Sequence, residues 1–270
     1  MVSKNLVWDF VLSLLILLVG LIYTSGTFQI LDINLYDESN YLASGLAILR
    51  GLPSAENAPI YAIWYGLISL LKADSIDLYF LNYRAMTVLP AIALFIALRV
   101  FAVPRNFSIV ISLGLLLSSA NFPVGPKVSH FALILLLAGL SISVILRNAS
   151  GKLAIIFFSC LLASYARPEY FLSAVIFGAT SIILLIGQVK YNGIKNLPVA
   201  ILLICLTGGV ILYLGTPIGG GDRSMVAFGQ HYSLNWVQIN DDSRNPWTNW
   251  EAIVASDFGN ASTLTDALTA

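Results

Sequence analysis

The feature that most constrains this fold is a series of seven apolar runs, each close to the length of a membrane-spanning helix. A helix needs about 20 mostly apolar residues to cross about 30 Å of hydrocarbon. Because lipid offers no partner to an unpaired backbone group, each crossing is expected to be helical. The expected spans are Leu6–Phe28, Leu78–Val103, Phe107–Phe122, Ser129–Leu146, Leu153–Ala166, Tyr170–Gly187 and Leu197–Gly215. The sequence thus predicts an all-α polytopic membrane protein with about seven transmembrane helices, a transmembrane domain over 1–215 and an extracytoplasmic segment over 216–270.

The composition favours a membrane environment and argues against several other classes. Hydrophobic residues make up 58% of the chain and charged residues 10%, with a mean hydropathy of +0.84; ordinary soluble domains are about 25% charged. The two cysteines, Cys160 and Cys205, lie within apolar runs, so no disulfide framework is expected. No Cys or His stands at metal-ligand spacing, so no structural zinc site is expected. No nucleic-acid partner is expected for this chain.

The charges indicate how the spans are oriented. With the N-terminus in the cytoplasm, alternating spans place Arg99, Arg105 and Lys152 on the cytoplasmic side, as the positive-inside rule expects. Apart from Asp9, every Asp and Glu then falls on the opposite side. We therefore expect an integral protein of a bacterial inner (plasma) membrane whose working face is extracytoplasmic.

The first outer loop, residues 29–77, is too long for a simple connection and contains two helical patterns too short to cross a membrane. In 38–50 the bulky apolar residues share one face, and in 60–72 three aromatic side chains favour the headgroup level. Asp37 suits the N-cap of the first pattern, and Gly51 followed by Pro53 ends it. Two interfacial helices are therefore expected in this loop.

Asp37 and Glu38 have both a structural and a functional interpretation. Acids at a helix start complement the helix macrodipole, and that alone could explain the pair. A carboxylate at the mouth of a membrane cavity could also act as a general base that takes a proton from an acceptor hydroxyl. The spacing of the residues leaves both interpretations open. The same pair could hold a divalent cation, although no further ligand is identifiable.

The order of motifs in this region resembles that of the GT-C glycosyltransferases, which include the protein O-mannosyltransferases and aminoarabinose transferases. The motifs are Asp37-Glu38-x-x-Tyr41, Gly51-Leu52-Pro53, Ala58-Pro59-Ile60-Tyr61 and Asn82-Tyr83-Arg84. The resemblance covers about the first hundred residues. It implies a donor sugar carried on a polyprenyl phosphate or diphosphate, an acceptor that is a glycan, lipid or protein, and a catalytic acid in the first outer loop. That role falls on Asp37, with Glu38 beside it.

A second polar site interrupts the expected fifth and sixth spans. The run Leu153–Ala166 is short, and Arg167, Pro168 and Glu169 separate it from the next run, so the two charges would lie at membrane depth. Charges at depth usually face a cavity, although Arg167 and Glu169 could form a structural pair or Arg167 could snorkel to headgroups. A donor phosphate needs a fixed positive charge, and Arg167 is the first candidate, followed by Arg84 and Lys127.

The rest of the substrate pocket is assigned to Tyr41, Glu169, Tyr170 and His231. His231 belongs to the polar, aromatic segment after Gly215, whose Trp and Tyr side chains suit either a sugar-binding surface or a membrane-surface loop. The chain stops at Ala270 within a helical pattern, and members of the resembled family carry further spans and an outer domain. We expect the sequence to be a C-terminally truncated piece of a longer protein that is inactive alone.

Two other functions fit the same sequence features. A polymerase or ligase of cell-envelope polysaccharide would use similar lipid-linked substrates but join whole glycans. A non-catalytic transporter or scaffold would use Arg167 and Glu169 as a coupling or structural pair. Transport predicts broken spans in two corresponding halves, and the sequence has one clear break.

Overall fold

The computed structural model describes residues 4–30, 36–53, 57–72, 74–121, 127–146, 149–192, 197–217, 222–259 and 264–269. Within these ranges all regular secondary structure is helical, which confirms the predicted all-α class. Contacts divide the chain into two compact units, Met1–Leu214 and Gly215–Ala270. The division falls one residue before the boundary expected from the sequence.

Four helices in the described residues are long and apolar enough to cross a membrane. They are α1 (Lys4–Tyr23), α5 (Ser75–Val100), α7 (Val128–Ile145) and α9 (Phe171–Asn192), the last counted with the short turn before it. The chain is therefore a membrane protein by the length and composition of its helices. The prediction of seven spans is met for these four only.

Two of the three remaining runs form helices that fall short of the same criterion. α6 (Arg105–Leu117) and α8 (Ala149–Ser164) have 13 and 16 residues, or about 20 and 24 Å of helix. The apolar run that contains α6 ends in an extended Ser118 and a 3-10 turn, Ser119–Asn121, rather than in further α-helix. The third run forms α10 (Leu197–Leu214), whose side chains are described from Cys205 onward, and Cys205–Leu214 is apolar.

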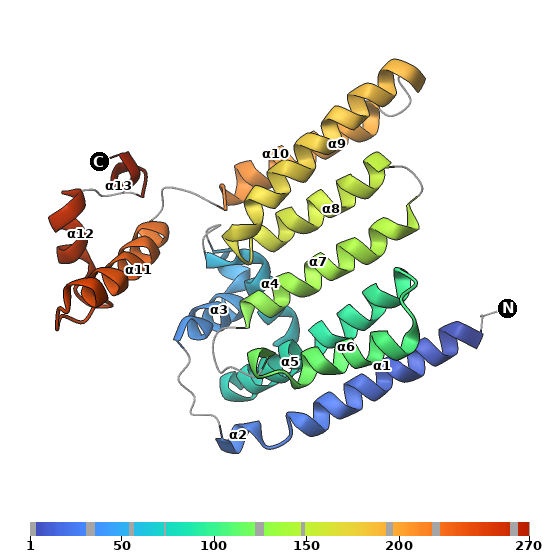
Figure 1. Cartoon of the computed structure of the whole chain (residues 1–270), viewed down its shortest axis with the longest axis horizontal. Coiled ribbons are helices and arrows are strands. Elements are labelled where there is room, and N and C mark those ends of the chain that lie inside the picture. Colours follow the sequence, from blue (N-terminus) through green and yellow to red (C-terminus); the bar gives the residue numbers. More distant parts are fainter. Residues whose placement is uncertain are drawn as a thin grey trace. The chain divides into compact units, whose positions relative to one another are not determined.

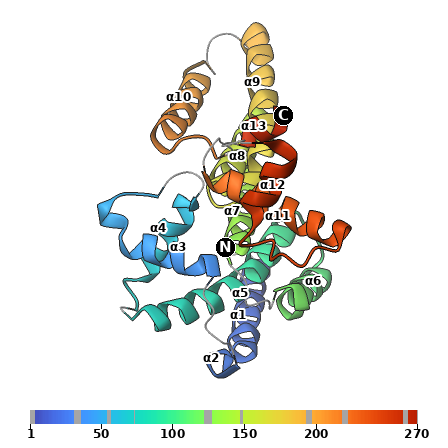
Figure 2. The same cartoon turned by 90° about the vertical axis from the view of Figure 1, so that its left-hand side faces the viewer.

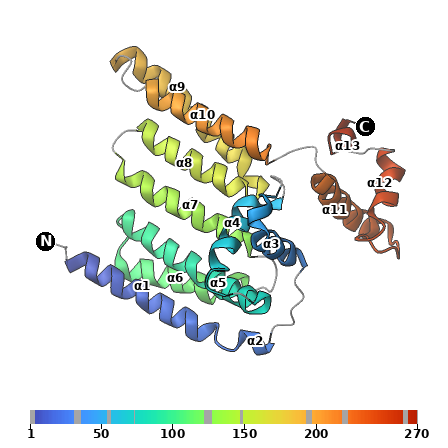
Figure 3. The ribbon, with the colours of Figure 1, turned by 180° about the vertical axis from the view of Figure 1, so that it is seen from behind.

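The helices of the first unit lie side by side in an order that follows the chain (Figure 1). α1 packs on α5 and α6, α5 packs on α7, α7 on α8, and α8 on α9. At the first of these contacts Ile16, Phe95 and Leu116 are fully buried. Figure 3 shows the same arrangement from behind, with α10 beside α9.

The two helices of the long loop lie where the long helices of this row end, on one side. α3 (Tyr36–Leu46) continues into a 3-10 turn at Ile48–Arg50, and α4 (Pro59–Ile68) packs against α3. Both lie at the end where α7 begins and α8 finishes, away from the N-terminus (Figures 1 and 3), and Figure 2 looks onto this end. The predicted ranges, 38–50 and 60–72, were close, but α4 ends four residues early. Their place at a membrane surface stays a prediction.

Gly45 allows α3 and α4 to approach closely. A Cβ atom at this position would lie 2.3 Å from Cβ of Tyr65 and 3.0 Å from the carbonyl oxygen of Ala62. Neither neighbour is the end of a flexible side chain, so the helices would have to move apart. Glycine at position 45 therefore sets how far the Tyr65 side of α4 lies from α3.

The predicted break between the fifth and sixth runs is present. α8 ends at Ser164, Arg167 has an extended backbone with φ −140° and ψ 108°, and a 3-10 turn, Pro168–Tyr170, leads directly into α9. Proline cannot donate a backbone hydrogen bond, which explains why the helix does not continue through position 168. The break leaves Arg167 at the junction of two packed helices.

The second unit is also helical and has its own small core. Its helices are α11 (Asp222–Asn240), α12 (Trp250–Phe258) and α13 (Leu264–Thr269). Residues 218–221, which include the glycine run at 219–221, lie outside the described residues. Met225, Val254 and Ala267 are buried, and four aromatic side chains pack around them: Phe228, Tyr232, Trp250 and Phe258. The aromatic residues of this segment thus serve largely to pack its helices.

The close approach at Gly45 predicts opposite effects for two matched substitutions. Gly45→Ala should lower the free energy of unfolding by about 1–3 kcal/mol, because the added methyl group overpacks the contact between α3 and α4. Gly114→Ala, in α6, should be neutral or stabilising by up to about 1 kcal/mol, because a Cβ there meets nothing within 4 Å. Thermal unfolding of both variants in detergent would measure the difference. Equal stability of the two would contradict the packing argument.

Candidate functional site

The centre of the candidate site is the carboxylate of Glu38, which is buried with 4% of its surface exposed. Its Oε1 accepts hydrogen bonds from Tyr61 Oη at 2.7 Å, Tyr65 Oη at 2.5 Å and Asn82 Nδ2 at 2.8 Å. Its Oε2 accepts from the backbone N–H of Lys127 at 3.0 Å. A buried carboxylate is tolerated when such donors replace water. We call Glu38, Tyr61, Tyr65, Asn82 and Lys127 the Glu38 cluster.

The Glu38 cluster joins four separate segments of the first unit. Tyr61 and Tyr65 stand one turn apart on α4, so both hydroxyl groups reach the same oxygen. Asn82 lies in the first third of α5, and Lys127 immediately precedes α7. Because the four donors come from α4, α5 and the residue before α7, this one carboxylate holds α3 against α4, α5 and α7.

Hydrogen bonds within the cluster fix the donors as well. Asn82 Nδ2 also donates to Tyr61 Oη at 2.7 Å and to Tyr65 Oη at 2.8 Å, while its Oδ1 accepts from Trp64 Nε1 at 2.7 Å. The Tyr61 ring packs edge-to-face on Tyr65 and on Tyr41, with centroids 5.3 and 5.4 Å apart. The amide and the rings are therefore held in one arrangement.

The environment explains the protonation of these groups. Burial raises the pKa of Glu38, and the hydrogen bonds from Tyr65, Tyr61 and Lys127 partly offset that rise. Burial raises the pKa of Tyr61 and of Tyr65 as well, and the nearby Glu38 charge adds to both shifts. Both tyrosines therefore stay protonated and act as hydrogen-bond donors.

Lys127 is an interior group and presents little surface to a ligand. Its side chain is 2% exposed, and Nζ donates to the carbonyl oxygen of Asn121 at 2.7 Å and lies 4.6 Å from the centroid of the Tyr83 ring. Burial lowers the pKa of Lys127 to about 8, and the Glu38 charge partly opposes that shift. In this geometry its ammonium group supports the Glu38 cluster, although a phosphate-binding role was predicted for it.

Asp37, the predicted base, is exposed, whereas its neighbour Glu38 is buried. The prediction that Asp37 caps the helix was wrong, because α3 begins at Tyr36 and Asp37 lies in its first turn. Residues 31–35, which would include the cap, lie outside the described residues. An exposed acid in the first turn still complements the helix dipole. The two acids, predicted as a pair, thus occupy different environments.

Arg167 connects to the same region through α7. Its Nε donates to Ser129 Oγ at 2.7 Å. Ser129 is two residues from Lys127, whose backbone N–H binds Glu38, and Glu38 is adjacent to Asp37. Two hydrogen bonds and short chain segments therefore link Arg167 to the first turn of α3. The structure therefore connects the break between α8 and α9 to the first outer loop through the start of α7.

Three other predicted pocket residues have distinct surroundings. Tyr41 is 3% exposed and belongs to the apolar cluster against which Tyr170 packs, so both line the interior beside the Glu38 cluster. Glu169 is exposed, and in the described part of the chain no ion pair joins it to Arg167. The structural pairing of Arg167 with Glu169 that the sequence allowed does not form.

Arg84 and His231 lie outside the Glu38 cluster. Arg84 Nε donates to the carbonyl oxygen of Thr24 at 3.4 Å, which ties α5 to the end of α1. His231 is an exposed residue of the second unit, where its ring packs edge-to-face on Trp247 with centroids 6.2 Å apart. Their roles in phosphate binding and in the substrate pocket stay predictions.

Sequence reasoning missed three members of the Glu38 cluster. Tyr61 and Tyr65 were interpreted as aromatic residues at the headgroup level, yet both are fully buried and donate to Glu38. Asn82 was noted only within a family-like motif. The available signal was a pair of tyrosines at i and i+4 and an amide inside an apolar run, since buried polar side chains need partners.

Asp37 and Glu38 do not fit a shared divalent cation. Both oxygens of Glu38 face N–H and O–H donors in a buried setting, whereas Asp37 is exposed. Nowhere in the described ranges do three or more His, Cys, Asp or Glu side chains gather closely enough to hold a metal ion. In the described geometry the two acids therefore do not form a shared cation site.

Comparison with known proteins gives no relative. No protein-family model matches the sequence, and neither the curated proteins nor the solved structures include a significant match.

The hydrogen bonds around Glu38 predict that the stability of the fold depends on both of its carboxylate oxygens. Glu38→Gln should lower the free energy of unfolding by about 1–3 kcal/mol, because an amide N–H₂ would face the N–H of Lys127 or the tyrosine donors. Glu169→Gln, at an exposed acid, should change it by less than about 0.5 kcal/mol. Thermal unfolding in detergent compares the two variants. A Glu38→Gln protein as stable as Glu169→Gln would show that the cluster does not hold the helices together.

Proposed function

We propose that this chain is a GT-C-like glycosyltransferase that transfers a sugar from a polyprenyl-phosphate donor to an acceptor outside the membrane. The observation that carries the proposal is the pairing of an exposed and a buried acid, Asp37 and Glu38, at the start of α3. Glu38 is held by four donors, so the first turn that presents Asp37 is fixed to three other segments. A positioned, exposed carboxylate suits general-base catalysis.

In the proposed reaction Asp37 takes the proton of the acceptor hydroxyl as its oxygen attacks C1 of the donor sugar. The bond between C1 and the phosphate oxygen breaks through an oxocarbenium-like transition state, and polyprenyl phosphate leaves. Glu38 is a positioning residue in this scheme, because its oxygens are occupied by protein donors. Its exchange would act on the reaction through the placement of Asp37.

The leaving phosphate needs a fixed positive charge, and Arg167 is the best-placed candidate. Its guanidinium is partly buried at the break between α8 and α9 and is oriented by Ser129 through Nε, which leaves the terminal nitrogens for a phosphate. By contrast, Lys127 is committed to Asn121 and Tyr83, and Arg84 to Thr24. Tyr41 and Tyr170 would form the apolar wall beside the sugar, with Glu169 at its edge.

The membrane setting completes the proposal. A chain of seven spans with the N-terminus in the cytoplasm, in a bacterial inner membrane, would place α3, α4 and the break at the extracytoplasmic face. A lipid-linked donor could then enter from the bilayer, so no nucleotide-binding loop is required. The place of α3 and α4, at the ends of the long helices away from the N-terminus, agrees with this orientation (Figures 1 and 3).

Asp37→Asn should lower the rate of sugar transfer by about 10²–10⁴-fold, because the amide cannot accept the acceptor proton. Asp77→Asn removes an exposed acid that pairs with the exposed Lys72 and should leave the rate within about twofold. Release of polyprenyl phosphate from a panel of labelled polyprenyl-phosphate sugars, in membranes that contain the full-length protein, gives the rate without knowledge of the acceptor. Equal rates for the two variants would remove Asp37 from the site, and turnover of nucleotide sugars alone would remove the donor class.

Arg167→Gln should lower kcat for the same release by about 10²-fold, since it removes a donor to the developing phosphate charge. Arg167→Lys should recover part of the loss, because the charge returns without the planar fork. Arg84→Gln should change kcat by less than about threefold, since Arg84 is tied to Thr24. A larger loss of kcat for Arg84→Gln than for Arg167→Gln would mean that Arg84, and not Arg167, binds the donor phosphate.

A further inference from the structure

A second charged cluster lies at the other end of α5, far along the chain from the Glu38 cluster. Asp9 Oδ1 accepts hydrogen bonds from Arg99 Nε at 3.0 Å and from Arg105 Nε at 2.6 Å. These side chains are partly covered, with 22%, 19% and 28% of their surfaces exposed respectively. Two guanidinium groups share one carboxylate, so the three groups together carry one excess positive charge.

The hydrogen bonds among the described residues do not involve every donor nitrogen of Arg99. Arg99 Nη1 donates to the carbonyl oxygen of Val103, whereas Nη2 of Arg99 donates no hydrogen bond within the part of the chain that the structure describes. A guanidinium beside hydrocarbon is costly unless its donors and its charge are met. An anionic ligand would meet both.

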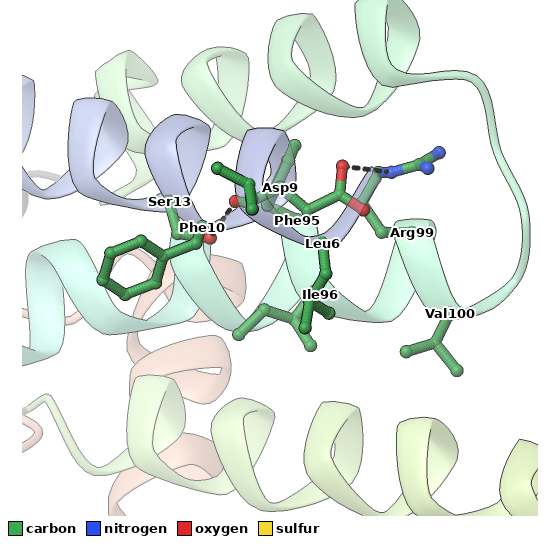
Figure 4. Close-up of a pocket in the computed structure, with 9 residues that line it drawn as sticks. Leu6, Asp9, Phe10, Ser13, Phe95, Ile96, Arg99 and Val100 are labelled. Carbon is green, nitrogen blue, oxygen red and sulfur yellow. Dashed lines mark hydrogen bonds and ion pairs between the residues drawn. The ribbon is translucent and has the colours of Figure 1, made fainter. Parts of the chain in front are cut away.

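An apolar groove of about 710 Å³ runs beside this cluster, between α1 and α5. Its apolar walls are Leu6, Val7, Phe10, Phe95, Ile96 and Val100. In Figure 4 the Phe10 ring lies on the left of the view and the Arg99 guanidinium on the right, where a dashed line joins it to the Asp9 carboxylate. The groove therefore has hydrocarbon along its walls and a cation at one end.

The groove opens onto a surface that faces lipid. α1 is apolar enough to cross a membrane, and Leu6, Val7 and Phe10 are 62%, 55% and 63% exposed. A free aqueous anion would not enter hydrocarbon beside these side chains, whereas a lipid brings its phosphate to the polar end and its chain to the apolar walls. Basic pockets between membrane helices commonly hold anionic headgroups in this way.

We propose that the groove between α1 and α5 is a binding site for an anionic phospholipid, with the phosphate at Arg99 and one acyl chain along Phe10 and Ile96. The occupant is a lipid rather than a protein segment because the site combines the charge of Arg99 with a lining that is apolar except for Asp9, Ser13 and Arg99 itself. Bound lipid would seal α1 against α5 at the end opposite to the Glu38 cluster.

The test is native mass spectrometry of the full chain, purified in detergent and titrated with two phospholipids of identical acyl chains. Phosphatidylglycerol carries the anionic headgroup and phosphatidylcholine the zwitterionic one. Wild-type protein should bind one phosphatidylglycerol at least about fivefold more tightly than phosphatidylcholine, the effect expected from one uncompensated arginine near a headgroup. Equal affinities would mean non-specific boundary lipid only and would overturn the proposal, without any variant having to fold.

Two pairs of variants locate the site. Arg99→Gln should remove the preference for phosphatidylglycerol while the pair of Asp9 and Arg105 remains, whereas Lys152→Gln, at an exposed cation of α8, should keep it. Ile96→Trp should fill the groove and weaken binding of both lipids about fivefold or more. Ile111→Trp is its control, because Ile111 is 46% exposed, as Ile96 is 45%, but lies outside the groove.

The remaining outcomes contradict the site. A preference lost equally in Arg99→Gln and Lys152→Gln would show attraction by the general charge of the protein. Lipid binding unaffected by Ile96→Trp would place the lipid elsewhere, and a dimer that Ile96→Trp dissociates would show that a second copy of the chain covers the groove. Because lipid binding is read by mass and sugar transfer by product release, failure of this proposal would leave the proposed activity standing.

Discussion

The first unit depends on one requirement: a carboxylate removed from water must be supplied with hydrogen-bond donors. Glu38 obtains them from Tyr61, Tyr65, Asn82 and the backbone of Lys127. No single helix could supply all four in this geometry, so α3, α4, α5 and the start of α7 must meet at this point. The loss of one donor would leave a buried charge only partly satisfied, and such a group costs more than an ordinary hydrogen bond contributes. Small movements of α3 relative to α4 are therefore opposed.

This requirement separates the roles of two adjacent acids. Glu38 points inward and its oxygens are occupied, so it can fix a backbone but has little capacity to exchange a proton with a ligand. Asp37 is exposed on the same first turn, so its backbone inherits the rigidity that Glu38 creates. The hydrogen bond between Arg167 and Ser129 extends this control to the break between α8 and α9, since Ser129 follows Lys127 at the start of α7. A catalytic acid and a phosphate-binding cation need such a shared frame if they are to act on one substrate.

The parts of the fold that follow from local rules could be predicted from the sequence. Apolar length gave the long helices α1, α5, α7 and α9, and Pro168 with two flanking charges gave the break after α8. The rest depends on partners distant in the chain. The sequence indicated that Tyr61 and Tyr65 lie at the membrane surface as aromatic residues of one short helix. Glu38, to which both hydroxyl groups donate, is 23 and 27 residues away in the chain. The sequence marked Asp37 and Glu38 equally as acids, and only the packing of α3 on α4, which Gly45 permits, decides which one is buried.

α5 links the two charged regions of the first unit. Asn82 of the Glu38 cluster and Arg99, which pairs with Asp9, stand 17 residues apart on one helix, or about 25 Å. Most of the helix between them packs in the apolar interior, with Met86, Val88, Ala91 and Phe95 buried. Polar groups at its ends are therefore the points where α5 is fixed against its neighbours: α4 and α3 at one end, α1 and α6 at the other. At the first end the donors saturate the acid, whereas at the second the cations exceed it. The two ends thus differ: several donors surround one acid at the first, and two guanidinium groups share one acid at the second.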